Sequence, residues 1–184
     1  MSKEMNAIVL NKRGQYGYGT MPIPTPGPGQ ILVKLEACTI NPSDLFMMQG
    51  QYNIKHTYPF VPGWEGSGQV VAAGPGTLTQ WYLGKRVACM KQLEVIEYKF
   101  GGSFADYMVT DIKSVIPLPD DVDFEQGASF FINPMTALGM LKRAKKLGAD
   151  SIILTAGSSQ IGRMIIRLCP SYGITPIVTV RRSE

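Results

Sequence analysis

The sequence lacks several features that would assign it to a particular class of protein. No apolar run is long enough to cross a membrane, and the opening MSKEMNAIVL lacks the long apolar segment of a secretory signal peptide. The 3 cysteines, Cys38, Cys89 and Cys169, are widely spaced and form no Cys-x-x-Cys pair, so neither a disulfide framework nor a cysteine-rich zinc site is encoded. We therefore expect a cytoplasmic protein without a membrane partner.

A long basic segment with interleaved aromatic residues is also missing. The formal net charge is +4, but apart from the cluster at 142–146 and the pair Arg181–Arg182 the lysines and arginines are scattered. The cluster is typical of the solvated last turns of a helix, where cations interact favourably with the negative end of the helix dipole. The charge pattern therefore gives no support for binding to nucleic acid.

What is present indicates a globular chain with many tight turns. Hydrophobic residues make up 45% of the 184 residues and charged residues 17%, which is enough apolar material for a proper core. The 20 glycines and 13 prolines favour a β-rich portion with short connections. The length allows one domain, or one domain and part of another.

The first two thirds of the chain have the pattern of a β domain. The Pro/Gly-rich connector at 22–30 cannot continue a helix or a central strand. Short β-rich runs separated by Gly and Pro turns predict a barrel-like or sandwich-like domain. The predicted strands lie within 7–10, 31–41, 66–76, 84–90 and 102–111.

Near residue 120 the pattern becomes helical. Asp123 is a candidate N-cap, and Pro134 is a candidate start for a second helix that ends near Leu147, with Gly148 as its C-cap. A β run, a Gly/Ser-rich turn, an amphipathic helix and another β run then follow. This order predicts one βαβ unit with parallel strands and a right-handed crossover. We place the β domain at 1–125 and the βαβ part at 126–184.

The turn TAGSSQIG at 155–162 is a candidate phosphate site. A strand is predicted to end near Leu154 and a helix to start near Gln160. In a nucleotide-binding βαβ unit, glycines such as Gly157 and Gly162 let the backbone approach a pyrophosphate at the helix N-terminus. The hydroxyls of Ser158 and Ser159 can donate to phosphate. The pattern is not a complete G-x-G-x-x-G, and an ordinary βα loop remains an equal alternative.

The second β run of this unit ends in VTVRRSE. A dinucleotide fold meets the adenosine ribose at this place, where an acidic residue would bind the 2′-hydroxyl of NAD. The sequence has Arg181 and Arg182 there, whose guanidinium groups suit a 2′-phosphate. The pattern favours NADP(H) over NAD(H), with two solvated arginines as the alternative.

Five motifs in order give the chain a family resemblance. The segments INPSDLFMMQGQY, PFVPGWEGSGQVVAAG, GGSFADYMVT, INPMTALGML and ILTAGSSQIGRMIIRL resemble the medium-chain dehydrogenase/reductases, most closely the zinc-independent quinone oxidoreductases and 2-enoyl thioester reductases. The resemblance implies a mixed α and β fold: a GroES-like β-barrel domain followed by the first βαβ part of a Rossmann-type domain. It also implies a homodimer in the full-length form.

The resemblance implies a reaction. The expected function is NADP(H)-dependent transfer of a hydride to an activated C=C of an enoyl thioester or enone, or to a quinone. Zinc-binding members carry a Cys where this sequence has Asn41 and a His where it has Trp64. Because neither an amide nor an indole is a normal zinc ligand, we predict no metal.

The resemblance also assigns site residues. Tyr52 would hold a thioester carbonyl or help to deliver a proton, and Asn41 would contact the nicotinamide. Asn133 and Thr136 would face the nicotinamide and ribose from a helix start, while Gln160 and Ile161 complete the phosphate turn. Many relatives have Gly at the Gln160 position, so this side chain adds bulk there. The alternatives are an ordinary aromatic at Tyr52 and a simple helix-start signal at Asn133-Pro134.

The second domain is short for a dinucleotide fold. Such a fold has about six strands, and the pattern here ends after two, which predicts C-terminal truncation. A fragment, a truncated product and a chain that completes its sheet with another chain remain open. The alternative function is a non-catalytic GroES-like module or an inactive fragment of such a reductase.

Overall fold

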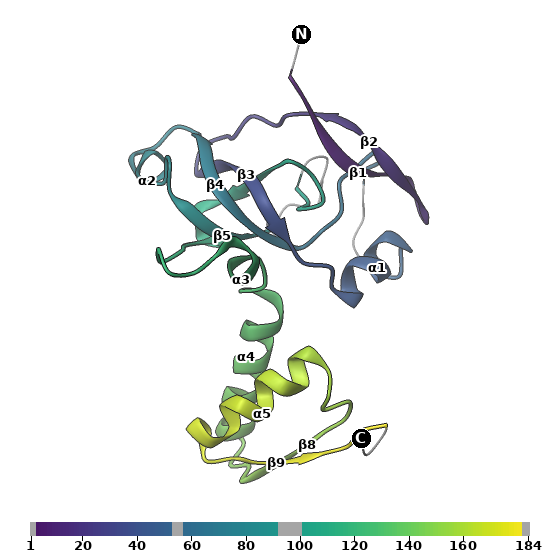
Figure 1. Ribbon diagram of the computed structural model, residues 1–184, viewed down its shortest axis with the longest axis vertical. Coiled ribbons are helices and arrows are strands. Elements are labelled where there is room, and N and C mark those ends of the chain that lie inside the picture. The colour runs from purple at the N-terminus through teal and green to yellow at the C-terminus, as the bar shows by residue number, and fades with distance from the viewer. Residues whose placement is uncertain (1–2, 53–56, 92–100, 182–184) are drawn as a thin grey trace. The chain divides into compact units, whose positions relative to one another are not determined.

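The computed structural model describes residues 3–52, 57–91 and 101–181 (Figure 1). Their contacts divide the chain into two compact units, Met1–Ser129 and Phe130–Glu184. The mixed α and β fold class predicted from the sequence is confirmed. Among the described residues, no helix is long and apolar enough to cross a membrane.

The first unit is built from antiparallel strands. β1 (Glu4–Lys12) and β2 (Gln15–Pro22) form a hairpin that turns at Gly14, whose φ of 70° favours glycine. The other five form one sheet in the order β6-β3-β4-β5-β7. They are β3 (Gln30–Cys38), β4 (Glu65–Ala73), β5 (Arg86–Met90), β6 (Tyr107–Asp111) and β7 (Val115–Pro117).

Two apolar clusters hold this unit together. The sheet buries alternate residues on one face, and these side chains form one cluster that includes Ile31, Val33, Val70, Val87 and Met108. The β1–β2 hairpin contributes a second cluster, in which Met5, Ala7, Val9 and Met21 pack with Val61. The period of two places Met5, Ala7 and Val9 on one face of β1, and Ile31 and Val33 on one face of β3. Leu10 and Leu32 are buried as well, so both faces of these strands are covered at those positions.

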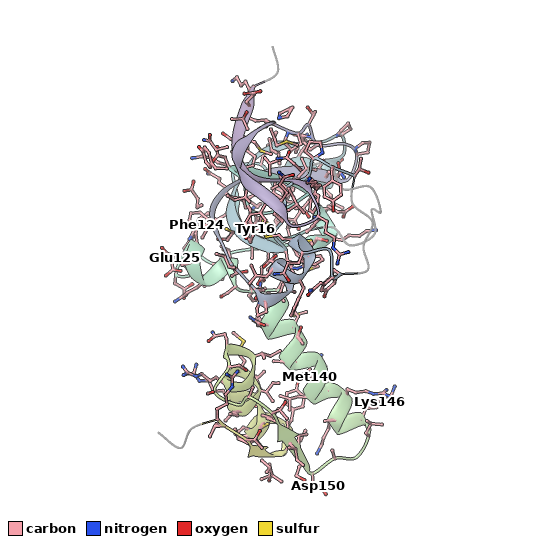
Figure 2. The ribbon with its side chains drawn as sticks, turned by 90° about the vertical axis from the view of Figure 1, so that its right-hand side faces the viewer. Tyr16, Phe124, Glu125, Met140, Lys146 and Asp150 are labelled. Atoms are coloured by element: carbon pink, nitrogen blue, oxygen red, sulfur yellow. The ribbon has the colours of Figure 1, made fainter. Side chains whose placement is uncertain are left out.

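Short helices connect and flank the strands. α1 (Pro42–Met48) follows β3, α2 (Thr77–Trp81) follows β4, and a single 3₁₀ turn (Ile112–Ser114) precedes β7. α3 (Phe124–Ala128), on which Figure 2 labels Phe124 and Glu125, ends the unit. Its predicted N-cap is confirmed, because Oδ1 of Asp123 accepts a hydrogen bond of 2.7 Å from Gln126 N.

The second unit contains two helices and two parallel strands. They are α4 (Ile132–Lys146), β8 (Ser151–Leu154), α5 (Gln160–Tyr172) and β9 (Thr175–Val178). Pro134 does not begin α4 as predicted, since the helix starts two residues earlier. Proline is tolerated there because the N–H groups of the first turn have no helical acceptor.

The core of this unit lies where the two helices pack. Ala137 and Leu141 of α4 are buried against Ile165 and Cys169 of α5, together with Ile174. Figure 2 labels Met140 and Lys146 on α4 and Asp150 just before β8. The backbone O of Asp150 accepts from Thr175 N at 2.9 Å, which aligns the two strands.

Gly68 lies where the central strands β3 and β4 approach too closely for a side chain to fit. A Cβ at this position would lie 1.9 Å from the backbone O of Lys34, an atom that cannot yield without moving β3. We expect Gly68→Ala to destabilise the first unit by about 1–3 kcal/mol or more. Gly17→Ala on β2 is the matched control, because nothing lies within 4 Å of its Cβ. Urea unfolding followed by the fluorescence of Trp64 and Trp81, both in this unit, measures the difference; equal effects of the two substitutions would contradict it.

Candidate functional site

Asn41 lies at the junction between β3 and α1. Pro42 follows it as the first helical residue, where its fixed φ suits a helix start. The backbone N–H of Asn41 donates to Oδ2 of Asp44 at 2.7 Å, and the N–H of Asp44 donates to the backbone O of Asn41 at 2.9 Å. The Asn-Pro-Ser-Asp segment therefore ends the strand and begins the helix by its own hydrogen bonds.

The side-chain amide of Asn41 is engaged inside the protein. Nδ2 donates to Thr39 Oγ1 at 3.0 Å and to Glu65 Oε1 at 3.2 Å. Thr39 Oγ1 in turn donates to the same Glu65 oxygen at 2.9 Å. Asn41 is 5% exposed and Glu65 is 1% exposed. These bonds connect the end of β3 to the start of β4, so Asn41 has a structural role here, and its contact with a nicotinamide stays a prediction.

Two buried charged residues belong to the same region. The pKa of Asp44 is raised to about 6, chiefly by burial and also by the Glu65 charge. Hydrogen bonds from the backbone of Asn41 and Trp64, and the Lys91 charge, act in the opposite direction. Burial lowers the pKa of Lys91 to about 8, against the effect of Asp44. The Lys91 Nζ lies 5.3 Å from the centroid of the Phe60 ring. Sequence reasoning missed both residues, although the Asp three positions after Asn41 is a helix-capping signal.

Tyr52 is held by an aromatic contact. Its ring centroid lies 5.3 Å from that of Trp64, with the ring planes tilted by 55°. Trp64 is buried and Tyr52 is 43% exposed, so one face of the phenol is packed and the rest is open. Trp64 Nε1 is buried and makes no hydrogen bond within the described residues. Tyr52 contacts Trp64, and Asn41 is hydrogen-bonded to Glu65, the next residue along the chain. The two predicted catalytic residues therefore contact adjacent residues at the start of β4.

The arrangement at Asn41 and Trp64 does not resemble a metal centre. The described residues contain no group of three or more His, Cys, Asp or Glu side chains that could hold a metal ion. His56 lies outside the described residues. The absence of a catalytic metal stays a prediction. It is based on Asn41 and Trp64, which stand where zinc-binding members of the resembled family carry Cys and His.

In the second unit, the strand and helix bounds predicted around the turn at 155–162 are confirmed. β8 ends at Leu154 and α5 begins at Gln160. Ser159 is the N-cap, and its Oγ accepts from Gly162 N at 3.2 Å, while its own O–H can still donate. Ser158 and Gln160 are exposed, so the Gln160 side chain does not fill the turn.

The two glycines of this turn are required by packing. A Cβ on Gly157 would lie 1.9 Å from Val178 Cγ1 of β9. A Cβ on Gly162 would lie 2.6 Å from the backbone O of Gly157. The helix can therefore start close to the strand only with glycine at both positions. The N–H groups of Gln160 and Ile161 point out of the first turn of α5, where no helical carbonyl is available to them.

Other predicted cofactor residues are spread over the second unit. Thr136 on α4 donates from Oγ1 to the backbone O of Ile132 at 2.5 Å, and Asn133 is half-buried near the helix start. Arg181 is exposed just after β9, and Arg182 lies outside the described residues. The roles of Asn133 and Thr136 in binding the cofactor stay predictions.

Comparison with known proteins assigns the family. The profile of the alcohol dehydrogenase GroES-like domain matches residues 27–120, about half of the 184 residues. The chain belongs to this family. It is 31% identical to quinone oxidoreductase of Sus scrofa over 163 residues, which covers 88% of the chain and 47% of that protein. It is 33% identical to the mitochondrial enoyl-[acyl-carrier-protein] reductase of Caenorhabditis elegans over 167 residues, which covers 90% of the chain and 46% of that protein.

Solved structures agree with this family. A candidate NADPH:quinone reductase of Mesorhizobium loti matches with a TM-score of 0.88 and 35% identity, over 100% of the chain and 56% of that protein. A mycobacterial protein in complex with NADPH matches with a TM-score of 0.81 and 29% identity, over 97% of the chain and 53% of that protein. The predicted resemblance to medium-chain quinone oxidoreductases and enoyl reductases is confirmed. The chain spans about half the length of these relatives.

The buried carboxyl group of Asp44 gives a pH prediction for the GroES-like unit. Its pKa in the folded state, about 6, lies above its ordinary value of 3.8, so the folded protein favours the protonated form. This contribution to stability is complete well below pH 3.8 and is lost as the pH rises through 6. Relative to Asp44→Asn, the unfolding free energy of the wild type should fall by on the order of 3 kcal/mol over this whole range, and by about 2 kcal/mol between about pH 4 and about pH 6.

Urea unfolding at several pH values measures this difference. Asp121→Asn, at an exposed aspartate of the same unit, is the control for general effects of charge. A difference between wild type and Asp44→Asn that stays constant from pH 4 to 7 would contradict the buried, proton-binding carboxyl group.

Proposed function

We propose that this protein is an NADP(H)-dependent reductase that acts without zinc on an activated C=C or a quinone. The relatives named above are quinone oxidoreductases and enoyl reductases, and one structural neighbour was solved with NADPH. The observation that carries the proposal is the glycine-dependent turn between β8 and α5, which leaves two N–H groups and two serine hydroxyls at a helix N-terminus.

The turn at 155–162 fits the phosphates of a dinucleotide. The N–H groups of Gln160 and Ile161 would donate to phosphate oxygens, helped by the positive end of the α5 dipole. Ser158 and Ser159 would add hydroxyl donors. The Gln160 side chain is exposed, so it would leave room for the phosphates. Arg181 would bind a 2′-phosphate by charge-assisted hydrogen bonds.

The chemistry on the GroES-like side rests on Tyr52. When bound, a nicotinamide dinucleotide would supply the hydride to the substrate. The Tyr52 phenol, oriented by Trp64, would hold the substrate carbonyl or donate a proton to it.

The substitutions at Asn41 and Trp64 support a reaction without zinc. In place of metal ligands, Asn41 provides a hydrogen bond to Glu65, and Trp64 provides a ring that contacts Tyr52. Polarisation of the substrate carbonyl would then depend on hydrogen-bond donors and not on a Lewis acid. The proposed substrates are small molecules, and a homodimer of the full-length protein remains a prediction.

Cofactor preference tests the second unit directly. By isothermal titration calorimetry, we expect this chain to bind NADPH more tightly than NADH. Arg181→Ala should weaken NADPH about tenfold or more and leave NADH nearly unchanged, because a charged hydrogen bond to the 2′-phosphate is lost. Arg167→Ala, at another exposed arginine of the unit, is the control. Equal weakening of both cofactors would show that Arg181 is only a solvated charge, and failure to bind either would favour a non-catalytic module.

The role of Tyr52 is tested in the full-length protein. Tyr52→Phe keeps the ring contact with Trp64 but removes the hydroxyl, so reduction of a 2-enoyl thioester should slow by about 100-fold. Tyr58→Phe is the matched control, since its ring also contacts an aromatic neighbour, Phe60, and its exposed fraction of 37% is close to the 43% of Tyr52. Oxidation of NADPH, followed by absorbance, measures the rate. Unchanged turnover in Tyr52→Phe would remove the hydroxyl from the mechanism.

A further inference from the structure

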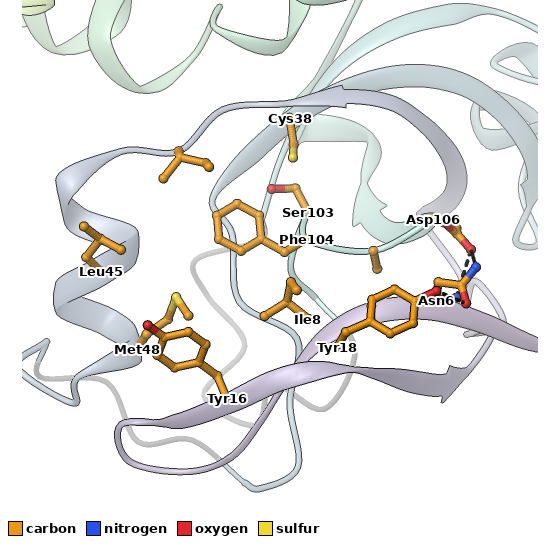
Figure 3. A pocket seen from close by; sticks show the side chains of 13 residues that line it. Asn6, Ile8, Tyr16, Tyr18, Cys38, Leu45, Met48, Ser103, Phe104 and Asp106 are labelled. Carbon is orange, nitrogen blue, oxygen red and sulfur yellow. Dashed lines mark hydrogen bonds between the residues drawn. The ribbon is translucent and has the colours of Figure 1, made fainter.

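The GroES-like unit contains a pocket that the proposed reaction does not use. Its volume is about 500 Å³, which is in the range of small-molecule sites. Figure 3 shows Tyr16 and Tyr18 of β2 along one side, Leu45 and Met48 of α1 at one end, and Asn6 with Asp106 at the other. Tyr52 and Asn41 are not among the lining residues, although Ile40, which precedes Asn41, is one of them.

The polar groups at the Asn6 end are already paired with one another. The backbone N–H and Nδ2 of Asn6 both donate to Oδ2 of Asp106, at 2.9 and 3.1 Å. The Tyr18 hydroxyl donates to Oδ1 of Asn6 at 2.8 Å. These bonds fix the Tyr18 ring on the side of the pocket and leave little polar capacity there for a ligand.

Ser103 is different, because its hydroxyl is buried without a partner. Ser103 is 1% exposed and lines the pocket, and its Oγ makes no hydrogen bond within the described residues. A buried hydroxyl of this kind costs free energy unless something binds it. Among the buried polar side-chain atoms of the described lining residues, it is the one without a hydrogen-bond partner. The oxygen itself has less than 1 Å² of exposed surface, so rotation of the Ser103 side chain toward the pocket would present it to a ligand.

The backbone holds Ser103 in this position. Its N–H donates to the O of Gly63 at 3.3 Å, and the N–H of Phe104 donates to the O of Pro62 at 3.0 Å. Gly63 has a φ of 102°, and a Cβ there would lie 2.4 Å from the Ser103 Oγ. The backbone of Ser103 is thus fixed against Gly63 beside the pocket, with the Phe104 ring next to the Ser103 side chain (Figure 3).

We propose that this pocket binds a compact, largely apolar molecule that carries one carbonyl group, with the carbonyl oxygen accepting a hydrogen bond from Ser103. The aromatic and aliphatic lining supplies apolar burial, and the single buried hydroxyl supplies orientation. An anionic ligand does not fit, because the one charged side chain among the lining residues, Asp106, is itself an anion. The proposal concerns binding to the GroES-like unit alone and is independent of the cofactor and of Tyr52.

A matched pair of ligands tests the hydrogen bond. The bicyclic ketone 1-tetralone and its hydrocarbon analogue tetralin differ in the carbonyl group. We expect the chain to bind both, with 1-tetralone tighter, and to show NMR shifts at Ile8, Met48 and Ser103. Ser103→Ala should weaken 1-tetralone about three- to tenfold and leave tetralin unchanged, because one neutral hydrogen bond is lost. This variant should fold, since it removes an unpaired buried hydroxyl.

A second pair of variants tests the location independently of Ser103. Tyr16→Ala should weaken both ligands because it removes a side of the pocket. Trp81→Ala should change neither; it is the matched control, because Tyr16 is 55% exposed and Trp81 is 56% exposed on the same unit. The proposal is overturned if wild type binds neither ligand, if Ser103→Ala affects both ligands equally, or if the NMR shifts lie outside the pocket.

Discussion

The organisation of the first unit depends on one shared hydrogen-bond acceptor, the buried Glu65 carboxylate. It receives hydrogen bonds from Thr39 and Asn41, so the chain that leaves β3 is fastened to the first residue of β4. This connection fixes the junction from which α1 starts, and Tyr52 lies four residues beyond the end of that helix. Burial of an acceptor costs free energy unless the acceptor receives hydrogen bonds. The donors to Glu65 are Thr39 and Asn41, which lie at the candidate site.

The family resemblance predicts that Asn41 and Trp64 stand where zinc-binding relatives carry metal ligands. In this structure the Asn41 amide donates hydrogen bonds within the protein, and the Trp64 ring packs against Tyr52. Both positions therefore still organise the site, but through packing and hydrogen bonding. In the same region, burial raises the pKa of Asp44 and lowers the pKa of Lys91, which favours the neutral form of each group.

Local patterns predicted much of this structure, and long-range contacts explain what they missed. The bounds of β8 and α5 and the cap at Asp123 follow from short-range rules, so the sequence sufficed for them. The strand β2 was not predicted, because its glycines and exposed tyrosines lack an apolar alternation and it forms by pairing with β1. Asp44 and Lys91 were missed because their burial arises from residues distant in sequence. The bonds of Asn41 likewise depend on Glu65, 24 residues away.

The close approach of Gly157 to Val178 has a consequence for how the second unit assembles. The N–H of Gly157 also donates to the O of Thr179, so the turn is bonded to the residue that follows β9. The loop after β8 therefore reaches its final shape only when β9 is in place. Strand pairing and completion of the turn are one cooperative event, and a chain shortened to end before β9 would lose the helix-terminal donors along with the strand.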